Sequence, residues 1–390
     1  MPASPRTARA INDRLALRLL QEEGPLTAGQ LKDRTGLSRP TVADLVERLT
    51  AAGLIEVVGE AGAQRRGPNA RLYGIVAGRA HLAALDVRTG GVRLVVADLV
   101  GTVLAEASVP VGAGEEAGAA VERTVTTLER TAKEAGVERL HTVGVGAPGL
   151  IDPATGELRD SSGLPQWHRR LVSALQERLP ARVLVENETN LAALAERRDG
   201  AARDRDTFAL LWLGLGIGAA VVLDGKLRRG ASGGTGEVGF LPVPGTGGLP
   251  SASGCDGGFH SLAGSAAILE LAAEHGLVGP GEPLEHAADV VRAGDAAFLD
   301  ALADRVVLGA AAVVAVLDPG CVVLAGEVGR AGGEALAERV AARLAGMSPL
   351  PTEVRAGELG GAAVLRGALL VARETAQEAV YPRWSGESGG

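Results

Sequence analysis

The sequence contains few aromatic residues, two cysteines and no long apolar segment. Phe, Trp and Tyr make up 2% of the 390 residues, whereas 46% are hydrophobic and 56 are glycine, which indicates an α/β protein with a core of small aliphatic side chains. Cys255 and Cys321 lie far apart, which excludes a disulfide framework and favours a reducing cytoplasm. The longest uncharged apolar run, residues 208–223, is interrupted by glycines and is shorter than the about 20 residues of a membrane helix. The N-terminus lacks the apolar core of a signal peptide, so we expect a cytoplasmic protein without a membrane segment.

Most of the chain has no excess of basic residues. The formal net charge is −8 at pH 7, which argues against general binding of nucleic acid over the whole surface. Residues 1–76 nevertheless carry a charge of +3, while residues 77–390 carry −11. The length suffices for two to three domains. We therefore expect any contact with DNA at the N-terminal end.

Turn and capping residues divide the first 52 positions into helical segments. A helix is expected from Ala8 to Glu23, where Gly24 and Pro25 end it. Thr27 is the expected N-cap of a short helix that runs through Arg34, and Gly36 then makes a tight turn. Ser38 caps a further helix over residues 39–52, whose first turn accepts a proline because the missing amide has no helical partner there. This order is typical of a helix-turn-helix.

The helix over residues 39–52 has one apolar side, and the chain after it predicts a hairpin. Val42, Leu45 and Leu49 share the apolar side, and polar residues lie opposite. Residues 54–58 and 72–76 predict two strands joined by an arginine-rich loop, as in the wing of a winged helix, where arginines contact phosphates or the minor groove. The residues expected to contact DNA are Ser38, Arg39, Thr41, Arg48, Arg65, Arg66 and Arg71.

Each of these features also has a purely structural interpretation. Two helices joined by a glycine turn occur in many helical bundles, and arginines on a loop are commonly only solvated. The order and spacing of the helix pair and the arginine-rich loop together favour DNA binding over these structural interpretations.

The rest of the chain alternates short strands with glycine-rich turns. Residues 81–87, 92–99 and 103–109 predict strands, and residues 115–135 predict a helix. Further turns include Gly146-Ala147-Pro148-Gly149-Leu150-Ile151-Asp152 and two glycine clusters, residues 214–218 and residues 233–239 around Glu237. Glycine turns between strands are structural more often than functional, but they also let backbone amides approach an anion.

Together with the segment Glu186-Asn187-Glu188-Thr189-Asn190, these turns resemble the ROK family of sugar kinases and sugar-responsive repressors. The resemblance implies an α/β fold in which a winged helix-turn-helix, residues 1–76, precedes a two-lobed actin-like (ribonuclease H-like) domain, residues 77–390.

The departures from the family pattern fall at positions that carry chemistry. Family kinases have Asp as general base where this chain has Glu188, and a catalytic group misplaced by roughly 1 Å can cost on the order of a hundredfold in rate. Arg88 lies in the segment that matches the first phosphate loop. Glu327 adds a negative charge where the kinases approach the nucleotide. These three departures predict a degenerate kinase domain without catalytic residues.

The zinc ligands of the family are also missing. The family His position holds Phe240, and the loop at residues 251–258 has no ligand at the matching positions. Cys255 is displaced from them, and one thiol cannot make a closed tetrahedral site. We expect no structural zinc and no other cofactor.

Polar residues persist where the family binds sugar. The resemblance assigns ligand contacts to Asn187, Glu188, Glu237 and His260, whereas Gly163 replaces a sugar-contacting Asn. Asn187 and Glu237 have a structural alternative, which is to satisfy loop amides, and His260 has the alternative of an ordinary helix-surface histidine. A site that recognises hydroxyls discriminates strongly, so these substitutions imply a ligand other than glucose.

Three classes of function remain open. The favoured class is a DNA-binding regulator of transcription that represses genes for sugar uptake or metabolism and responds to a sugar or sugar derivative. The second is an active ATP-dependent sugar kinase fused to a DNA-binding domain, and the third is a constitutive DNA-binding protein without a small ligand. For the first class the resemblance implies a homodimer or homotetramer on a double-stranded operator with an inverted repeat, and no membrane partner.

Overall fold

The N-terminal part of the chain folds into three helices and a small antiparallel sheet. The computed structural model describes residues 5–61, 70–112, 114–159, 166–251, 257–279 and 281–381. The elements of this domain are α1 (Pro5–Glu22), β1 (Leu26–Thr27), α2 (Ala28–Thr35), α3 (Arg39–Ala51), β2 (Ile55–Ala61) and β3 (Ala70–Ile75). β3 pairs with both other strands, so the order is β1-β3-β2. The predicted helices and hairpin are confirmed, and the short strand β1 was not predicted.

The caps expected from the sequence form in the structure. The Thr27 side chain accepts a hydrogen bond from the Gln30 amide, and the Gln30 side chain accepts one from the Thr27 amide, which makes a capping box. Gly36 ends α2 at φ 69°, in the left-handed region. The Ser38 hydroxyl accepts from the Thr41 amide at 3.4 Å and starts α3. These contacts fix the turn between α2 and α3.

The core of this domain extends into the domain that follows. Leu17, Leu45 and Ile55 are at most 1% exposed and belong to the same apolar cluster as Leu82 and Tyr381. The N-terminal domain is therefore packed against the rest of the protein by apolar contacts, after a short 3-10 turn, η1 (Ala77–Arg79).

The first lobe of the larger domain is a five-stranded sheet with two covering helices. The sheet has the order β6-β5-β4-β7-β8, with antiparallel pairing on one side of β4 and parallel pairing on the other. Its elements are β4 (His81–Arg88), β5 (Gly91–Asp98), β6 (Val103–Pro110), α4 (Ala117–Glu134), β7 (Thr142–Ala147), α5 (Trp167–Arg178) and β8 (Arg182–Asn187).

The second lobe repeats the topology of the first. Its sheet has the order β11-β10-β9-β12-β13, again antiparallel up to the third strand and parallel after it. The strands are β9 (Phe208–Leu213), β10 (Ile217–Leu223), β11 (Lys226–Arg228), β12 (Cys321–Ala325) and β13 (Glu353–Ala356). The helices are η2 (Val238–Phe240), α7 (His260–Ala263), α8 (Ser265–Glu274), η3 (Leu284–His286), α9 (Ala287–Ala293), α10 (Ala296–Leu317), α11 (Gly326–Met347) and η4 (Gly360–Ala362). Two sheets of equal strand order define the two-lobed architecture.

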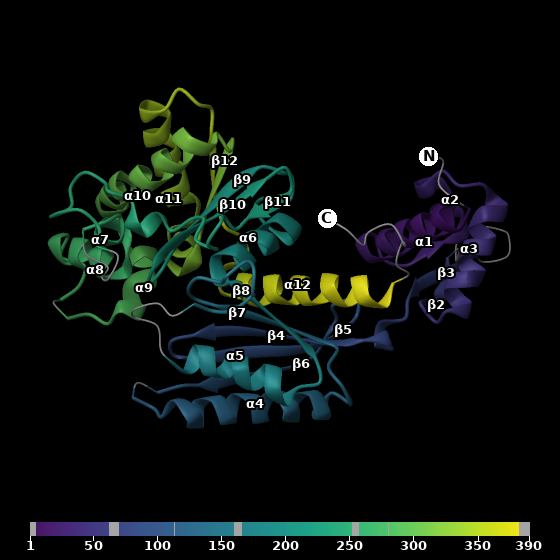
Figure 1. Cartoon of the computed structure of the whole chain (residues 1–390). Coiled ribbons are helices and arrows are strands. Elements are labelled where there is room, and N and C mark those ends of the chain that lie inside the picture. Colours follow the sequence, from purple (N-terminus) through teal and green to yellow (C-terminus); the bar gives the residue numbers. More distant parts are fainter. Residues whose placement is uncertain are drawn as a thin grey trace.

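Two helices, α6 (Glu188–Asp199) and α12 (Ala363–Val380), link the lobes. They pack closely, since a Cβ atom on Gly367 would lie 2.1 Å from the Leu191 carbonyl oxygen. Figure 1 shows α12 running below α6 toward the N-terminal domain. Near its end, the Gln377 side chain donates to the Leu99 carbonyl oxygen at 3.2 Å. Ala376 of α12 also belongs to the apolar cluster that forms the core of the N-terminal domain, so α12 links the lobes to that domain.

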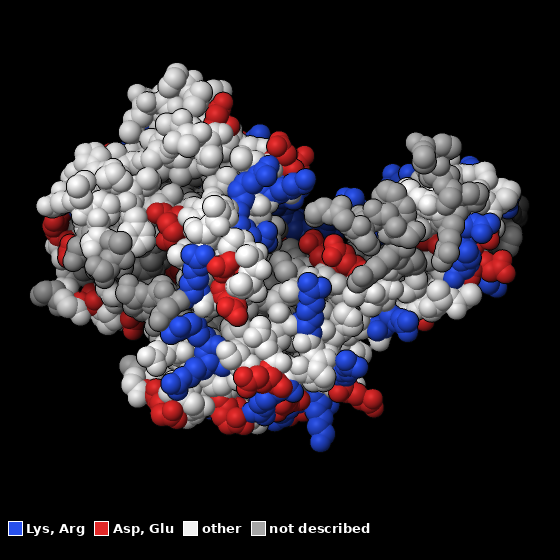
Figure 2. All heavy atoms as spheres, in the orientation of Figure 1, with Lys and Arg blue, Asp and Glu red and all other residues white. Residues whose placement is uncertain are grey.

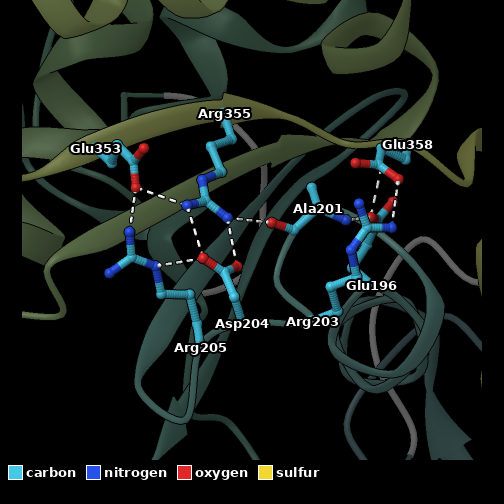
Figure 3. A network of polar contacts seen from close by, with 8 residues as sticks. All are labelled: Glu196, Ala201, Arg203, Asp204, Arg205, Glu353, Arg355 and Glu358. Atoms are coloured by element: carbon cyan, nitrogen blue, oxygen red, sulfur yellow. Dashed lines mark hydrogen bonds and ion pairs between the residues drawn. The ribbon is translucent and has the colours of Figure 1, made fainter.

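A buried carboxylate joins the end of α6 to the segment after β13 (Figure 3). Glu196 is 0% exposed and accepts hydrogen bonds from the amides of Ala201, Glu358 and Leu359 at 2.8, 3.2 and 2.9 Å. Beside it, Arg355 donates to the Ala201 carbonyl oxygen at 2.7 Å. Three backbone amides on two separate segments thus depend on one side chain.

Several details differ from the sequence-based predictions. β4 continues through Arg88, so this residue ends a strand rather than lying in a phosphate loop. The helical segment after residue 259 is interrupted at Gly264, between α7 and α8. The linking helices α6 and α12, together with α5 and α11, were not predicted; in α6 and α11 the apolar residues show little helical periodicity, because these helices contact several neighbours. Of the described helices, none is both long and apolar enough to cross a membrane.

Candidate effector site and nucleic-acid interface

The start of α3 presents one free cation and a pair of hydroxyls. Arg39 is exposed and makes no ion pair with the described residues. The hydroxyls of Ser38 and Thr41 lie 2.8 Å apart and hydrogen-bond to each other. Ser38 therefore shapes the helix start, and Arg39 beside it is available for an outside acceptor.

Arg48 lies differently from the expected outward position. Its Nη2 atom is 2.6 Å from Asp13 Oδ1 on α1, and its other amino group pairs with Asp44. Asp13 is only 8% exposed, so the contact binds α3 to the inner side of α1. The structure corrects the expectation that Arg48 points away from the domain, and a DNA contact by this residue remains a prediction.

The wing is partly described. Arg71, on β3, is exposed, as a residue that contacts phosphate must be. Arg65 and Arg66 lie outside the described residues, so their contacts with DNA remain predictions from the sequence.

In the larger domain, the two lobes meet at an ion pair that fills the glycine turn. Arg88 at the end of β4 pairs through Nη1 with Glu327 at the start of α11, 239 residues away. Its Nε atom lies 3.0 Å from Asp86 Oδ2. A Cβ atom on Gly214 would be 2.5 Å from Glu327 Oε2, so the carboxylate of Glu327 lies directly on the turn of residues 214–218. The turn faces a carboxylate of the protein itself.

Glu188 lies within the electrostatic reach of this ion pair. Burial raises the pKa of the Glu188 carboxyl to about 8; Arg88 opposes the shift, and the carboxylates of Asp86, Glu327 and Glu237 add to it. Burial also raises the pKa of the Asp86 carboxyl, with Arg88 opposing. A carboxyl group with a pKa near 8 is mostly protonated at pH 7 and donates a hydrogen bond instead of accepting a proton.

Asn187 is the N-cap of α6. Its side-chain oxygen accepts from the amides of Thr189 at 2.8 Å and Asn190 at 3.3 Å, and its Nδ2 atom donates to the Gly149 carbonyl oxygen at 3.0 Å. The structural alternative considered for Asn187 is therefore realised. A ligand contact by Asn187 remains a prediction, because its side chain is occupied by this cap.

Sequence reasoning missed a second polar contact between the lobes, centred on Glu186. Glu186 is 6% exposed and accepts from the Asn187 amide and from Asn190 Nδ2, each at 2.9 Å. Its other oxygen lies 2.6 Å from Arg229 Nε, just after β11 in the second lobe. The i, i+4 spacing of Glu186 and Asn190 was the available signal, whereas nothing in the sequence pointed to Arg229.

Glu237 and His260 border the same glycine clusters. The Glu237 carboxylate makes no hydrogen bond with the described residues, and burial by the surrounding protein raises its pKa although the residue keeps contact with solvent. The His260 ring stacks edge-on against Phe240 with centroids 5.6 Å apart, and burial lowers its pKa. A Cβ atom on Gly239 would be 2.1 Å from His260 Nε2, so only glycine leaves room for the ring. An electrostatic interaction thus joins Glu188 to Glu237, and His260 packs on Gly239 two residues after Glu237, whereas Asn187 has a structural role.

The prediction that no zinc is bound concerns a loop of which the structure describes only Ser251, Gly257 and Gly258. Within the described ranges, no group of three or more His, Cys, Asp or Glu residues is arranged to hold a metal ion. Residues 252–256, including Cys255, lie outside those ranges.

The architecture defines a class of protein: a winged helix joined to a two-lobed, actin-like domain with the topology of a sugar kinase. The ROK family model matches residues 83–375, and the chain belongs to the ROK family. The MarR family model matches residues 11–66, in agreement with the N-terminal winged helix.

Relatives of this chain include repressors and kinases. It is 28% identical over 247 residues to an N-acetylglucosamine repressor of Escherichia coli, which covers 60% of this chain and 58% of the relative. It is 24% identical over 237 residues to a xylose repressor of Caldicellulosiruptor bescii, covering 60% and 59%. A glucokinase of Thermotoga maritima is 36% identical over 133 residues, 34% of this chain and 42% of the enzyme. The matches thus span less than two thirds of the length of these repressors.

Solved structures show the same fold. A ROK family transcriptional regulator, a homologue of the Escherichia coli Mlc protein, has a TM-score of 0.74 at 20% identity and covers 96% of this chain and 97% of its own. A ROK family glucokinase from Streptomyces griseus, in complex with glucose and AMPPNP, has a TM-score of 0.63 at 24% identity and covers 76% and 100%. The regulator, unlike the glucokinase, also covers nearly the whole of this chain.

Proposed function

We propose that this chain is a sugar-responsive regulator of transcription that acts as a repressor of genes for sugar uptake or metabolism. The observation that carries the proposal is the union of two parts in one chain. The first is a winged helix with the exposed Arg39 at the start of α3. The second is a ROK domain in which Glu327 lies on the glycine turn of residues 214–218. The names of two relatives, an N-acetylglucosamine repressor and a xylose repressor, support a sugar or sugar derivative as effector.

We further propose that the ROK domain binds its effector without phosphorylating it. Phosphoryl transfer depends on positioning and on neutralising the charge of the phosphates. Here Glu327 lies on the glycine turn, and the guanidinium of Arg88 is engaged by Glu327 and Asp86. Burial raises the pKa of Glu188, at the base position, to about 8, so at pH 7 the protonated form predominates and only the remaining carboxylate could accept a proton. Glu327 and the engaged Arg88 thus oppose the binding of phosphates, whereas Glu188 has a reduced fraction of the carboxylate form at pH 7.

The proposed DNA target is an inverted repeat bound by a homodimer or homotetramer. A two-fold symmetric protein presents two α3 helices to half-sites whose centres are about one or two helical turns apart, roughly 34–36 Å per turn. We assign contacts with base edges to Arg39 and Thr41. We also assign contacts with DNA to Ser38 and Arg48. The phosphate contacts are assigned to Arg65, Arg66 and Arg71 of the wing.

Gel-shift titration tests the DNA-binding half of this proposal. Full-length protein is compared with Arg65→Ala/Arg66→Ala and with a variant that lacks residues 1–76. Undiminished operator binding by the truncated variant would refute the assignment. The loss of a phosphate contact should weaken all sequences alike and reduce the slope of the salt dependence by about one.

Thermal unfolding with a panel of sugars, with and without MgATP, tests the sensing half. A ligand raises the melting temperature only when it binds the folded state. Stabilisation by a sugar alone supports a sensor, whereas the absence of any response across the panel leaves the constitutive DNA-binding class.

The second candidate is an active sugar kinase fused to a DNA-binding domain. It is favoured by the retained carboxyl of Glu188 and by the identity with a glucokinase over 133 residues. A coupled assay of ATP turnover with hexoses and amino sugars decides between the candidates. A rate of about 1 s⁻¹, the low end for kinases, would establish the second.

A further inference from the structure

A groove separates the DNA-binding domain from the lobes. It has a volume of about 930 Å³ and is lined by α1 on one side and by α6, the segment after it and α12 on the other. Figure 2 shows Lys and Arg atoms gathered on the part of the lobes that faces the N-terminal domain. The volume lies within the range of small-molecule sites, about 300–1,000 Å³. We refer to this feature as the interdomain groove.

Positive charge is in excess on the walls of the interdomain groove. Its lining contains seven arginines and four acidic residues. Some of the arginines are neutralised locally; Arg18, for example, pairs with Glu22 at 2.8 Å. Arg198 and Arg373 form no ion pair with a carboxylate of the described residues, and the one described acceptor of Arg373 is the Val100 carbonyl oxygen, at 3.2 Å. Two guanidinium groups thus face the groove without a direct ion pair among the described residues, and the Glu374 carboxylate in the same lining acts on both only through space.

Two polar atoms beside these arginines are buried without a partner. Tyr381 is 8% exposed, and its hydroxyl has no hydrogen-bond partner among the described residues. The Nε atom of Arg373 is in the same condition. Burial lowers the pKa of Arg373 and the charge of Arg198 lowers it further, whereas the carboxylates of Glu374 and Asp199 oppose the shift. Buried polar groups are nearly always paired in folded proteins, so these groups together lack an acceptor that also carries negative charge.

We propose that the interdomain groove is a binding site for a small phosphorylated molecule, held by Arg198, Arg373 and the hydroxyl of Tyr381. A phosphate group offers three strong acceptor oxygens and a charge of about −2, which suits two guanidinium groups and a hydroxyl better than a single carboxylate does. The site is separate from the sugar site at Glu188, and it goes beyond the proposed sensing function.

The position of the groove gives the ligand a structural consequence. Arg14 and Arg18 of α1 belong to the DNA-binding domain, whereas Arg198 and Arg373 belong to the helices that link the two lobes. A phosphate bound between them contacts both domains and stabilises one angle between them. Since operator half-sites have a fixed spacing, a fixed angle changes affinity for the operator.

The site is tested with inorganic phosphate as the probe. Thermal unfolding of the full-length protein is followed while phosphate replaces chloride at constant ionic strength. We expect a saturable rise in melting temperature that chloride does not produce. An identical response to both salts overturns the proposal.

Three variants locate the binding. Arg198→Gln should weaken the apparent affinity for phosphate about tenfold, because it removes a charge-assisted hydrogen bond, and Tyr381→Phe should weaken it about threefold. Tyr381→Phe removes a hydroxyl without a protein partner, so its melting temperature without phosphate should not fall. Arg292→Gln, an exposed arginine on α9, is the matched control and should respond as the wild type does. A wild-type response in both Arg198→Gln and Tyr381→Phe overturns the assignment.

The remaining source of phosphate is the DNA backbone, and a second arm tests it. If the arginines of the interdomain groove bind phosphates of the DNA backbone, Arg198→Gln should reduce the slope of the salt dependence for binding to a non-operator duplex by about one. The response to inorganic phosphate should then be unchanged. That result would overturn the proposal of a small ligand and identify the DNA backbone as the partner of the groove. An unchanged DNA slope together with a weakened phosphate response supports the small ligand. Neither result depends on sugar binding, so the proposed sensing function is tested separately.

Discussion

The DNA-binding domain and the ROK domain are held together by contacts of different range. In the first, the decisive contacts join neighbours in sequence: Thr27 to Gln30 and Ser38 to Thr41, each three residues apart. In the second, Arg88 reaches Glu327 over 239 residues, and Glu196 reaches Leu359 over 163. The comparison teaches that a recognition helix can be shaped locally, whereas the place where the lobes meet depends on the whole domain.

The difference should appear most strongly in stability. Glu196→Ala leaves the amides of Ala201, Glu358 and Leu359 without their acceptor, and each unsatisfied buried amide costs about 1–3 kcal/mol. We expect the free energy of unfolding in urea to fall by at least about 3 kcal/mol.

Glu338→Ala, at an exposed position on α11, is the control and should change stability by less than about 0.5 kcal/mol. Equal losses in the two variants would show that the Glu196 contacts do not stabilise the larger domain.

The next largest effect separates two arginines of α3. Arg39→Ala should cost roughly 1–3 kcal/mol of operator binding and relax specificity at one base pair, with no loss of stability, because Arg39 is exposed and makes no ion pair with the described residues. Arg48→Ala should instead lower the melting temperature, since its partner Asp13 is left buried without its ion pair between α1 and α3.

Fluorescence anisotropy with single-base operator variants measures the first effect, and thermal unfolding the second. The comparison fails if Arg48→Ala relaxes base specificity while its melting temperature stays at the wild-type value.

A pH titration sharpens the contrast at the meeting point of the lobes. Burial raises the pKa of Glu188 to about 8, so folding favours its protonated form. The resulting stability is fully present below the unfolded pKa of about 4.3 and is lost as pH rises through about 8.

Between about pH 5 and pH 9 we expect this loss to reach at least about 1 kcal/mol in the wild type and to be absent in Glu188→Gln. Glu106→Gln, on the exposed edge strand β6, is the control and should keep the wild-type profile. Parallel pH profiles for wild type and Glu188→Gln in urea unfolding would remove Glu188 as the titrating group.

The smallest expected effect is local to α3. Ser38→Ala removes the side-chain cap from the Thr41 amide and should cost about 1 kcal/mol. Hydrogen exchange should show faster opening in the first turn of α3, with the sheets of the lobes unaffected.

Thr50→Ala, an exposed change in the same helix, should not produce this loss, because alanine has the higher helix propensity. Faster exchange throughout the ROK domain would mean that the cap contributes to more than local structure.

Much of the DNA-binding domain could be predicted because its signals are short in range. Caps, a glycine in the left-handed region and an apolar side at helical spacing each belong to a few adjacent residues, and α2 and α3 formed where they indicated. Arg48 is the exception, because its partner Asp13 lies 35 residues away on another helix.

In the ROK domain, the sequence identified the residues of the site but not their contacts. Glu188, Glu237 and Glu327 were singled out, and the structure brings their charges within reach of one another. Arg229 and Glu196 were missed, since an ion pair or a buried carboxylate leaves no periodic mark in the chain.

The sequence by itself determined the family, the order of the two domains and the loss of the kinase pattern, because each is recorded in residue identity at fixed spacing. Only the tertiary structure decided that Asn187 is a helix cap, that Arg88 is paired with Glu327 and that an arginine-lined groove lies beside α1. The physical reason is that the partners of a charged or polar side chain depend on distance in space, and chain folding alone brings residues 239 positions apart into contact.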